Sequence, residues 1–395
     1  MTRHATPPPL PIDTIVALCV LNHVAMAGSR VALALHALRL GVPSLGLALM
    51  LAPYALTSAL GALPIGRWVD RVGARMPALA GMAVTTLGLA VAAWQPGRAV
   101  LAVSATLVGL GYVASVIALQ SELARERGGA GQADGFARFA IGTAASSGFG
   151  PFLAGQCMAH GGARVAFGTL ALASLAACCS GAWNARRLQA IRPARVGVAI
   201  APAPWFSPRT LAGLGGLRRL LLADLLMAFA WNANSFTIPL VGHRHGWSDD
   251  TVGNLLGCFG IAVMLVRALP SALRTRGGNW ATITRALVVG GGVLMLLPVA
   301  ATLPVPYALE ALLGCGLGSS LPSMLALIEA RTPAGRRAEA LGLRQVVLGI
   351  GAATLPTTLG TLVCAIGLGA AVVGFGGALL ACAVAIAPRR KRQRS

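Results

Sequence analysis

The chain has 395 residues, of which 56% are hydrophobic and only 11% are charged, and its mean hydropathy is +0.74. This composition excludes an ordinary soluble domain, in which about a quarter of the residues are charged. The formal net charge of +21 would suit a nucleic-acid-binding protein if it lay on a soluble domain.

Long apolar runs follow one another along almost the whole chain. About 20 apolar residues span a bilayer as a helix, and in lipid every backbone polar group needs an internal partner, so such runs must be helical. We therefore predict twelve membrane-spanning helices, at 14–38, 43–66, 75–95, 98–120, 133–159, 164–186, 217–241, 250–272, 279–301, 305–328, 337–364 and 367–387.

The N-terminal tail, residues 1–12, is rich in proline and leads into a first helix that is too long for the apolar part of a signal peptide. We expect it to remain uncleaved. In that helix His23 and Arg30 are seven residues apart and therefore share a face, with Asn22 alongside. Ionisable groups inside a bilayer are costly and usually functional, so these three residues are candidates for binding substrate or protons.

The second and third runs are separated by Gly66-Arg67-Trp68-Val69-Asp70-Arg71-Val72-Gly73-Ala74-Arg75. Four of its ten residues ionise, which predicts a tight reversal at the membrane surface. Further charges follow the fourth and tenth runs: Glu122 with Arg138, and Glu329 with Arg344. Their simplest interpretation is a set of solvated charges at the membrane surface.

The fifth run contains Gly150-Pro151-Phe152-Leu153-Ala154-Gly155. Proline removes a backbone hydrogen bond and kinks a helix, and small residues allow a neighbouring helix to approach closely. The pattern predicts a kinked packing seam.

Polar and aromatic side chains in other runs are further candidates for contact with substrate or protons. They are Tyr54 in the second run, Tyr112 in the fourth, Asp224, Trp231, Asn232 and Asn234 in the seventh, and Glu310 and Ser320 in the tenth. Arg30 would attract an anionic or hydrogen-bonding group, and Asp224 or Glu310 would exchange a proton. The alternative is a static salt bridge between helices, or carboxylates that lie nearer the membrane surface than these boundaries place them.

Residues 187–216 interrupt the apolar pattern with four prolines and a run of arginines, so we assign them as a linker. It separates an N-terminal half, 13–186, from a C-terminal half, 217–387, which a basic tail, 388–395, follows. One offset of 205 residues aligns the halves without gaps: Arg39 and Gly41 with Arg244 and Gly246, Arg71 and Gly73 with Arg276 and Gly278, Gly109, Gly111 and Ser115 with Gly314, Gly316 and Ser320, and Pro151 and Gly155 with Pro356 and Gly360. The chain is therefore predicted to be an internal duplication.

Basic residues lie overwhelmingly on one side of the predicted helices. Of the 32, 26 fall in the two tails and the loops on the same side, whereas four fall on the other side. Positive loops stay in the cytoplasm, so we expect both termini there and the protein in a bacterial-type inner, or plasma, membrane. Insertion into a lipid bilayer explains the net charge without nucleic acid.

The sequence indicates neither a metal site nor a cofactor site. The eight cysteines all fall within predicted helices and form no C-x-x-C pair, which argues against disulfides and a zinc site. His243, His245, Asp249 and Asp250 are interpreted as an exposed loop rather than a metal site. No nucleophile and base occur together, so we predict neither an enzyme nor a bound cofactor.

The segment around Asp70 resembles the signature G-x3-D-R-x-G-x-R between the second and third helices of the major facilitator superfamily (MFS) of transporters. The resemblance covers residues 12–387 and implies an all-α membrane protein with the MFS fold, twelve helices in two pseudo-symmetric six-helix halves. It implies a gate on the cytoplasmic side formed by Gly66, Asp70, Arg71, Gly73, Arg75, Glu122, Arg138, Glu329 and Arg344. Helices 1, 4, 7 and 10 would line the cavity.

Gly150, Pro151 and Gly155 resemble the G-P-x-x-G-G signature of antiporters in that superfamily, with Ala154 in place of one glycine. The sequence departs from the patterns of the superfamily at two positions. Asp70 aligns with Thr275, so the acid is missing from the second copy, and Ala105 occupies the position of an arginine usual in proton-linked exporters.

The sequence thus predicts a monomeric secondary active transporter that moves a small organic molecule by alternating access, with proton-coupled efflux as the preferred direction. One alternative is uptake, or symport, of an organic anion, which Arg30 and Ala105 favour. Another is a membrane sensor or scaffold that no longer transports.

Overall fold

The computed structural model describes residues 10–124, 129–185, 215–269, 278–300, 302–331 and 337–387. Within these ranges the chain is helical apart from short turns, and no strand occurs. The predicted linker and both tails lie largely outside the described residues.

The helices follow the apolar runs closely. They are α1 (Ile12–Arg39), α2 (Ser44–Val72), α3 (Arg75–Trp94), α4 (Arg98–Ala124), α5 (Gly129–Trp183), α7 (Gly215–His245), α8 (Asp249–Ala268), α10 (Asn279–Leu296), the 3-10 turn η1 (Leu297–Val299), α11 (Val305–Arg331), α12 (Arg337–Ile366) and α13 (Leu368–Ile386). In the described part of the chain eleven helices are long and apolar enough to cross a membrane, and α5 counts once although it breaks at Gly162 into two segments. The twelve predicted helices are thereby confirmed.

The reversals between helices preserve the internal repeat. Glycines with positive φ form three pairs: Gly41 and Gly246 (67° and 69°), Gly73 and Gly278 (86° and 90°), and Gly162 and Gly367 (70° and 84°). The members of each pair are 205 residues apart. Because a side chain is strained in this conformation, the same backbone geometry at one spacing supports a duplication of the fold.

The turn in the charged segment around Asp70 is shorter than the sequence predicts. We predicted a ten-residue reversal, but residues from Gly66 to Val72 continue α2, and the chain reverses at Gly73 and Ala74. A Cβ at Gly66 would meet no neighbouring atom. The tight conformation therefore depends on Gly73 rather than on Gly66.

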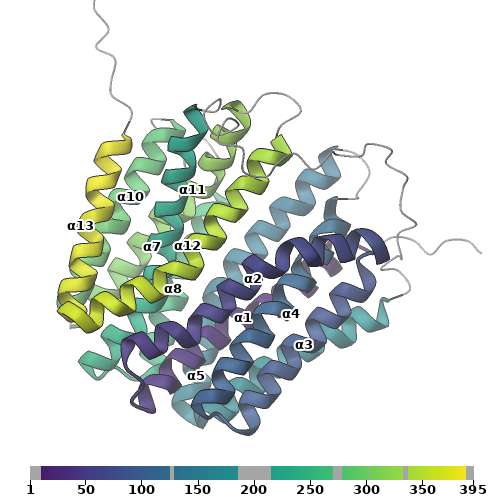
Figure 1. Cartoon of the computed structure of the whole chain (residues 1–395), viewed down its shortest axis with the longest axis horizontal. Coiled ribbons are helices and arrows are strands. Elements are labelled where there is room, and N and C mark those ends of the chain that lie inside the picture. The colour runs from purple at the N-terminus through teal and green to yellow at the C-terminus, as the bar shows by residue number, and fades with distance from the viewer. Residues whose placement is uncertain are drawn as a thin grey trace, which may run out of the picture.

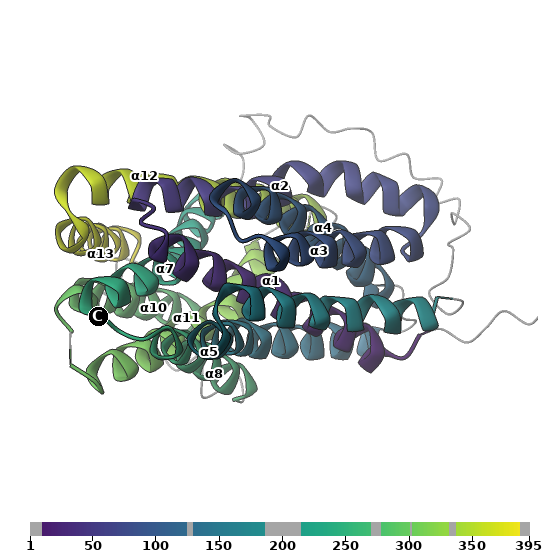
Figure 2. The ribbon, with the colours of Figure 1, turned by 90° about the horizontal axis from the view of Figure 1, so that it is seen from below.

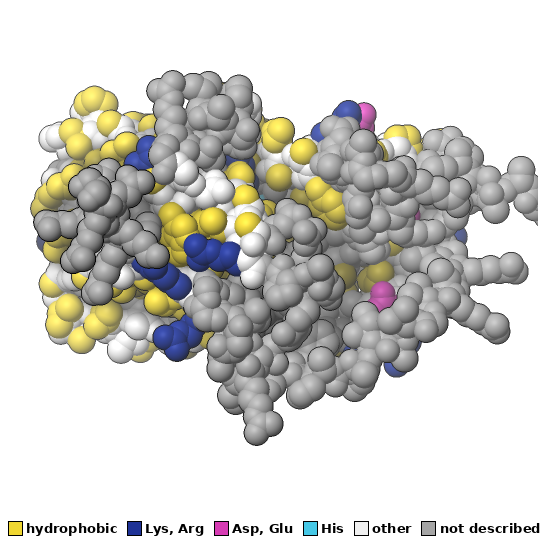
Figure 3. All heavy atoms as spheres, turned by 90° about the horizontal axis from the view of Figure 1, so that it is seen from above, with side chains coloured by type: hydrophobic (Ala, Val, Ile, Leu, Met, Phe, Trp, Pro, Cys, Tyr) yellow, Lys and Arg dark blue, Asp and Glu magenta, His cyan; other side chains and the backbone are white. Residues whose placement is uncertain are grey.

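The helices form two bundles, α1 to α5 and α7 to α13, which lie side by side (Figure 1). Along the boundary between them α2 packs on α12 and α5 packs on α8, on opposite sides of the central α1 and α7 (Figure 2). We call the end where α2 ends and α3 begins the basic end, because Arg67, Arg71 and Arg75 lie there. Figure 3 shows the molecule from above, with arginine side chains in dark blue. The other end, which holds Gly41 and Gly246, is called the opposite end.

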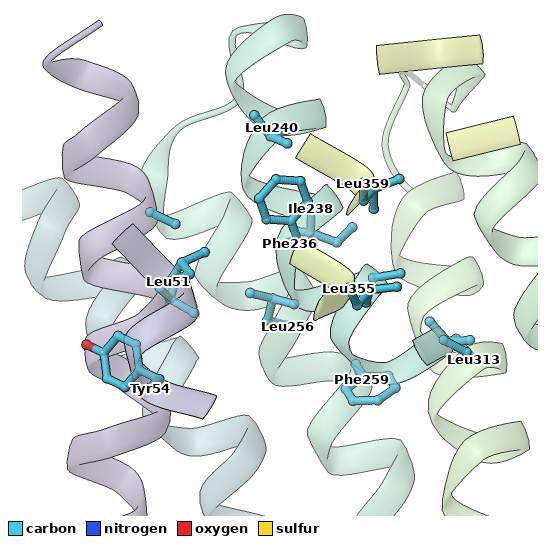
Figure 4. Packing of buried hydrophobic residues seen from close by; sticks show 14 of the residues in the cluster. Leu51, Tyr54, Phe236, Ile238, Leu240, Leu256, Phe259, Leu313, Leu355 and Leu359 are labelled. Atoms are coloured by element: carbon cyan, nitrogen blue, oxygen red, sulfur yellow. The ribbon is translucent and has the colours of Figure 1, made fainter. Parts of the chain in front are cut away.

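A continuous apolar core joins the two bundles. Side chains of α2, α7, α8 and α12 converge at the boundary, among them Leu51, Phe236, Phe259 and Leu355 (Figure 4). Large apolar side chains also cover the outside, for example Leu60 at 70% exposure and Leu172 at 64%. In lipid this exterior needs no burial, so the core at the boundary is where specific packing holds the halves together.

Candidate functional site: a cavity between the two halves

A cavity opens where the two bundles meet. It is lined by His23, Met26, Ala27, Arg30 and Val31 of α1, Leu51 of α2, Ser147 and Pro151 of α5, Trp231, Ser235 and Phe236 of α7, Leu256 and Phe259 of α8, and Pro356 of α12. Both halves contribute to its wall. The wall is mostly apolar, with a few polar groups, which is the usual make-up of a site for a small organic ligand.

Arg30 is the strongest charge in this wall. Its Nη2 donates a hydrogen bond of 3.3 Å to the amide oxygen of Asn232, which joins α1 of one half to α7 of the other. Its Nε is buried and has no hydrogen-bond partner among the described residues. The amide of Asn232 is held in turn by the carbonyl of Ala228, 2.8 Å from its Nδ2.

His23 lies two helical turns before Arg30 on the same face of α1 and also lines the cavity. Its Nδ1 is 2.6 Å from the hydroxyl of Ser146, and its ring is 5.5 Å from the ring of Tyr112 on α4. Tyr54 donates to the hydroxyl of Ser29 at 3.0 Å. Tyr112 and Tyr54 thus stand behind the residues of α1 and do not line the cavity themselves.

Asn22 was expected beside Arg30 in the pathway, but it faces the interior of the N-terminal half. Its Nδ2 donates to Ser115 at 2.6 Å, and its Oδ1 accepts from Ser174 at 3.1 Å. The residue is 2% exposed. Asn22 therefore ties α1 to α4 and α5, because its position on the helix is turned away from the boundary.

Asp224 and Arg344 were expected in different roles, and the structure brings them together. The Arg344 Nε lies 2.5 Å from the Asp224 Oδ2, and the Nη2 donates to Oδ1 at 3.3 Å. The two side chains are 7% and 13% exposed and join α7 to α12 within one half. Neither lines the cavity, so their geometry is that of a static salt bridge between helices.

Glu310 and Asn234 form a second buried pair in the C-terminal half. The Asn234 Nδ2 donates to the Glu310 Oε2 at 2.9 Å, while Oε1 has no partner among the described residues. Glu310 is fully buried and does not line the cavity. Ser320 also lies outside the lining and donates to the carbonyl of Leu317, within α11.

Trp231 does line the cavity, as the sequence suggested. Its ring meets the ring of Phe259 edge to face, with centroids 4.7 Å apart and planes at 75°. This arrangement is favourable for aromatic pairs and fixes a rigid apolar wall opposite α1.

The residues expected at the gate are spread over the basic end. Arg67, Asp70, Arg71 and Arg75 are exposed, and among the described residues they form no ion pair. Arg138 pairs with Asp13 at 2.7 Å within the N-terminal half. Glu122 has a bonding partner, and the side chain of Glu329 lies outside the described residues.

At the opposite end the two halves are joined by polar contacts that the residue patterns did not predict. The Arg39 Nη2 lies 2.6 Å from the Asp249 Oδ2, an ion pair between α1 and α8. Close by, the Gln156 Nε2 donates to Asn254 at 2.9 Å. The sequence does contain a signal for this ion pair. Asp249 and Asp250 stand at the start of the eighth predicted helix, and Arg39 is one of only four basic residues on the same side of the membrane.

Glycines bring α5 against both α1 and α8. A Cβ at Gly150 would lie 2.7 Å from the carbonyl oxygen of Val24, and a Cβ at Gly155 would lie 2.6 Å from the Cα of Gly253. A Cβ at Gly260 would lie 2.1 Å from the Cα of Gly148. The antiporter-like segment is therefore a packing seam between the halves, and Pro151 within it lines the cavity.

The family to which the chain belongs follows from its match to a known family. The model of the major facilitator superfamily matches residues 15–318 and 220–395, which together span nearly the whole chain. The chain belongs to the major facilitator superfamily. It is a multi-pass membrane protein of a transporter family, as the sequence predicted.

Solved structures share the fold. A peptide transporter of the POT type in complex with sulfate has a TM-score of 0.73 at 16% identity, with 96% of each chain covered. A POT family transporter in complex with 5-aminolevulinic acid has a TM-score of 0.73 at 12% identity, with 95% of each chain covered. The human organic anion transporter MFSD10 has a TM-score of 0.65 at 16% identity, covering 95% of this chain and all of that one. No curated protein sequence matches the chain.

Membership in the superfamily explains the position of the cavity. Its transporters are built from two halves related about an axis along the membrane normal, and substrate sites lie near the bilayer midplane where the repeats meet. In this chain Arg30 and Trp231 come from α1 and α7, the first helix of each half.

Proposed function

We propose that this MFS protein exports a small organic molecule from the cytoplasm by proton-coupled alternating access. The observation that carries the proposal is a cavity lined by both halves whose opposite end is latched by Arg39 and Asp249. At the basic end, the charged group at the end of α2 and the start of α3 (Arg67, Asp70, Arg71 and Arg75) is exposed and forms no ion pair among the described residues. This arrangement corresponds to one of the two states that a rocking transporter needs.

Orientation in the membrane rests on the arginine distribution. With 26 of 32 basic residues on the side of the termini, the positive-inside rule places the basic end in the cytoplasm of an inner membrane. The exposed group at the end of α2, Asp70 with Arg71 and Arg75, would then latch the cytoplasmic side in the alternate state, where Glu122 and Glu329 would contribute. A reporter fused after Ser395 that is active only in the cytoplasm tests this orientation.

Export is supported by the seam around Gly150, Pro151 and Gly155, which resembles the antiporter signature and forms part of the boundary between halves. A proton needs a titratable carrier. The buried carboxylate of Glu310, which has one oxygen without a partner among the described residues, is the candidate that the geometry favours.

Direction and coupling are tested together in proteoliposomes. A panel of radiolabelled organic acids, amines and neutral compounds is offered with a proton gradient of either sign, and a pH-sensitive dye inside the vesicles reports proton movement. Export predicts that a compound accumulates only when the gradient drives protons the other way. Accumulation in the same direction as protons would instead support the rival function, uptake of an organic anion, which Arg30 and Ala105 favour.

A sensor or scaffold without transport is the third possibility. It predicts that no compound moves under either gradient although ligands bind. Binding without flux in this experiment would refute the transport proposal.

A further inference from the structure

We propose that the transported substrate is a small organic anion with an apolar or aromatic body, and that the amide oxygen of Asn232 holds the place of its anionic group. The inference rests on the proposed transport function and names its substrate class. It is independent of the direction of transport.

The guanidinium of Arg30 is bound more weakly than its chemistry allows. An arginine fork suits two parallel bonds to a carboxylate or phosphate, yet its partner here is a neutral amide oxygen at 3.3 Å. Its buried Nε has no acceptor among the described residues. A buried charge without a counter-charge is expensive, and an incoming anion would remove that cost.

Carboxylates of the protein do not fill this role. No Asp or Glu is among the residues that line the cavity in the described part of the chain. The two buried carboxylates of the C-terminal half are bound elsewhere, Asp224 to Arg344 and Glu310 to Asn234. The cavity therefore presents a positive charge that a substrate must neutralise.

The other residues that line the cavity indicate the chemistry of the rest of the substrate. Trp231, Phe236, Phe259 and Leu51 offer aromatic and apolar surface beside Arg30 (Figure 4 shows Phe236, Phe259 and Leu51). Ser147 and Ser235 add two hydroxyls. An inorganic anion would leave the apolar wall unused, so the site fits an acid that carries a ring or short hydrocarbon chain.

Replacement of Asn232 by substrate would also act on the protein. The Arg30–Asn232 hydrogen bond joins α1 to α7 and so joins the two halves. An anion that takes over the guanidinium releases this bond, because the amide oxygen and the anion compete for the same donors. Occupancy of the cavity would thereby loosen one link between the halves.

The experiment measures thermal stabilisation of the purified full-length protein by phenylacetate, benzoate and 4-phenylbutyrate, beside phenylacetamide and phenethylamine. We expect one or more of the acids to stabilise the protein and the neutral and cationic compounds to have no effect, since ligand binding to the folded state raises its stability. Arg30→Gln should weaken acid binding by about tenfold or more. Arg30→Lys should keep the preference for acids.

The variant Asn232→Ala tests whether the Asn232 amide oxygen competes with the substrate for Arg30 or instead binds the substrate itself. It should bind the acid more tightly than wild type, because the competing oxygen is gone, while the ligand-free protein melts at a lower temperature. Arg285→Gln, which removes an arginine bonded to its own helix, is the matched control and should bind as wild type does.

Three results would overturn the proposal. They are the absence of stabilisation by every acid, equal stabilisation by phenylacetamide, and a loss of acid binding in Asn232→Ala as large as in Arg30→Gln. The assay needs no gradient and no flux, so a protein that binds acids but transports nothing would refute the proposed function and leave the assignment of the ligand class in place.

Discussion

At the scale of single residues, the structure separates charges that pair between helices from the charge that faces the cavity. Asp224 and Arg344 pair with each other away from the cavity, whereas Arg30 faces the cavity with a neutral partner. A sequence shows that each of these charges lies in an apolar run. It does not show which face of the helix meets which neighbour.

The pair of Asp224 with Arg344 should therefore behave as a structural element. Breaking a buried ion pair leaves an uncompensated charge, so Asp224→Asn should destabilise the protein by about 3–5 kcal/mol. The double variant Asp224→Asn, Arg344→Gln should lose less than the sum of the two single variants. Thermal unfolding in detergent measures both. Normal stability of Asp224→Asn with complete loss of transport would instead assign it to proton transfer.

The ion pair of Arg39 with Asp249 should bias the opposite end toward the closed state. Arg39 is 48% exposed, and pairs of this kind contribute about 1 kcal/mol or less. Asp249→Asn should therefore increase opening at this end by up to about fivefold. The measurement is the labelling rate of Ser147→Cys from that side by an impermeant thiol reagent, in a background without the eight native cysteines.

The internal repeat supplies the control for that experiment. Arg244 is the repeat counterpart of Arg39 and makes no ion pair among the described residues. Arg244→Gln should leave the labelling rate unchanged. An equal effect of Arg244→Gln and Asp249→Asn would mean that net charge at this end, rather than the latch, controls access.

At the scale of helices, the boundary between the halves depends on close approach of α5 and α8. A Cβ on Gly260 would lie 2.1 Å from the Cα of Gly148, so both backbones would have to move. Gly260→Ala should cost about 1–3 kcal/mol of stability, as overpacked sites do. Gly374→Ala in α13, where a Cβ would meet open space, should be neutral or slightly stabilising. Melting temperatures of both variants test this. Equal melting temperatures would show that close packing of α5 on α8 does not contribute to stability.

The helices themselves could be predicted from the sequence, because lipid requires a long apolar run to be helical whatever its neighbours are. The duplication could be predicted as well, since Gly73 and Gly278 keep one backbone conformation at one spacing. His23 and Arg30 could be assigned to a common face from the helical period alone.

Contacts between distant segments could not be predicted. The partner of Arg344 is 120 residues away on α7, and residue type alone does not single it out among the 11 acidic residues of the chain. Asn22 differs from His23 by a single position on α1, yet the helix turn directs it to Ser115 instead of the cavity. Such choices depend on the crossing of helices, which residue patterns do not encode.

At the scale of the whole molecule, the proposed function requires the two halves to rock about the central cavity. In this structure the opposite end is latched by Arg39 and Asp249, while the charged end of α2 is exposed. The alternate state would reverse this, with Asp70 and Arg71 engaged and Arg39 released. Ends that close in turn are the requirement for transport without an open channel.

The most direct test of that claim is a pair of spin-label distances in the full-length protein in lipid. One pair, Met76→Cys with Arg218→Cys, spans the basic end, and the other, Gln95→Cys with Arg244→Cys, spans the opposite end. If the halves rock about the cavity, Asp249→Asn lengthens the second distance and shortens the first within the same population. Two distances that stay constant, or that lengthen together, would contradict alternating access through this cavity.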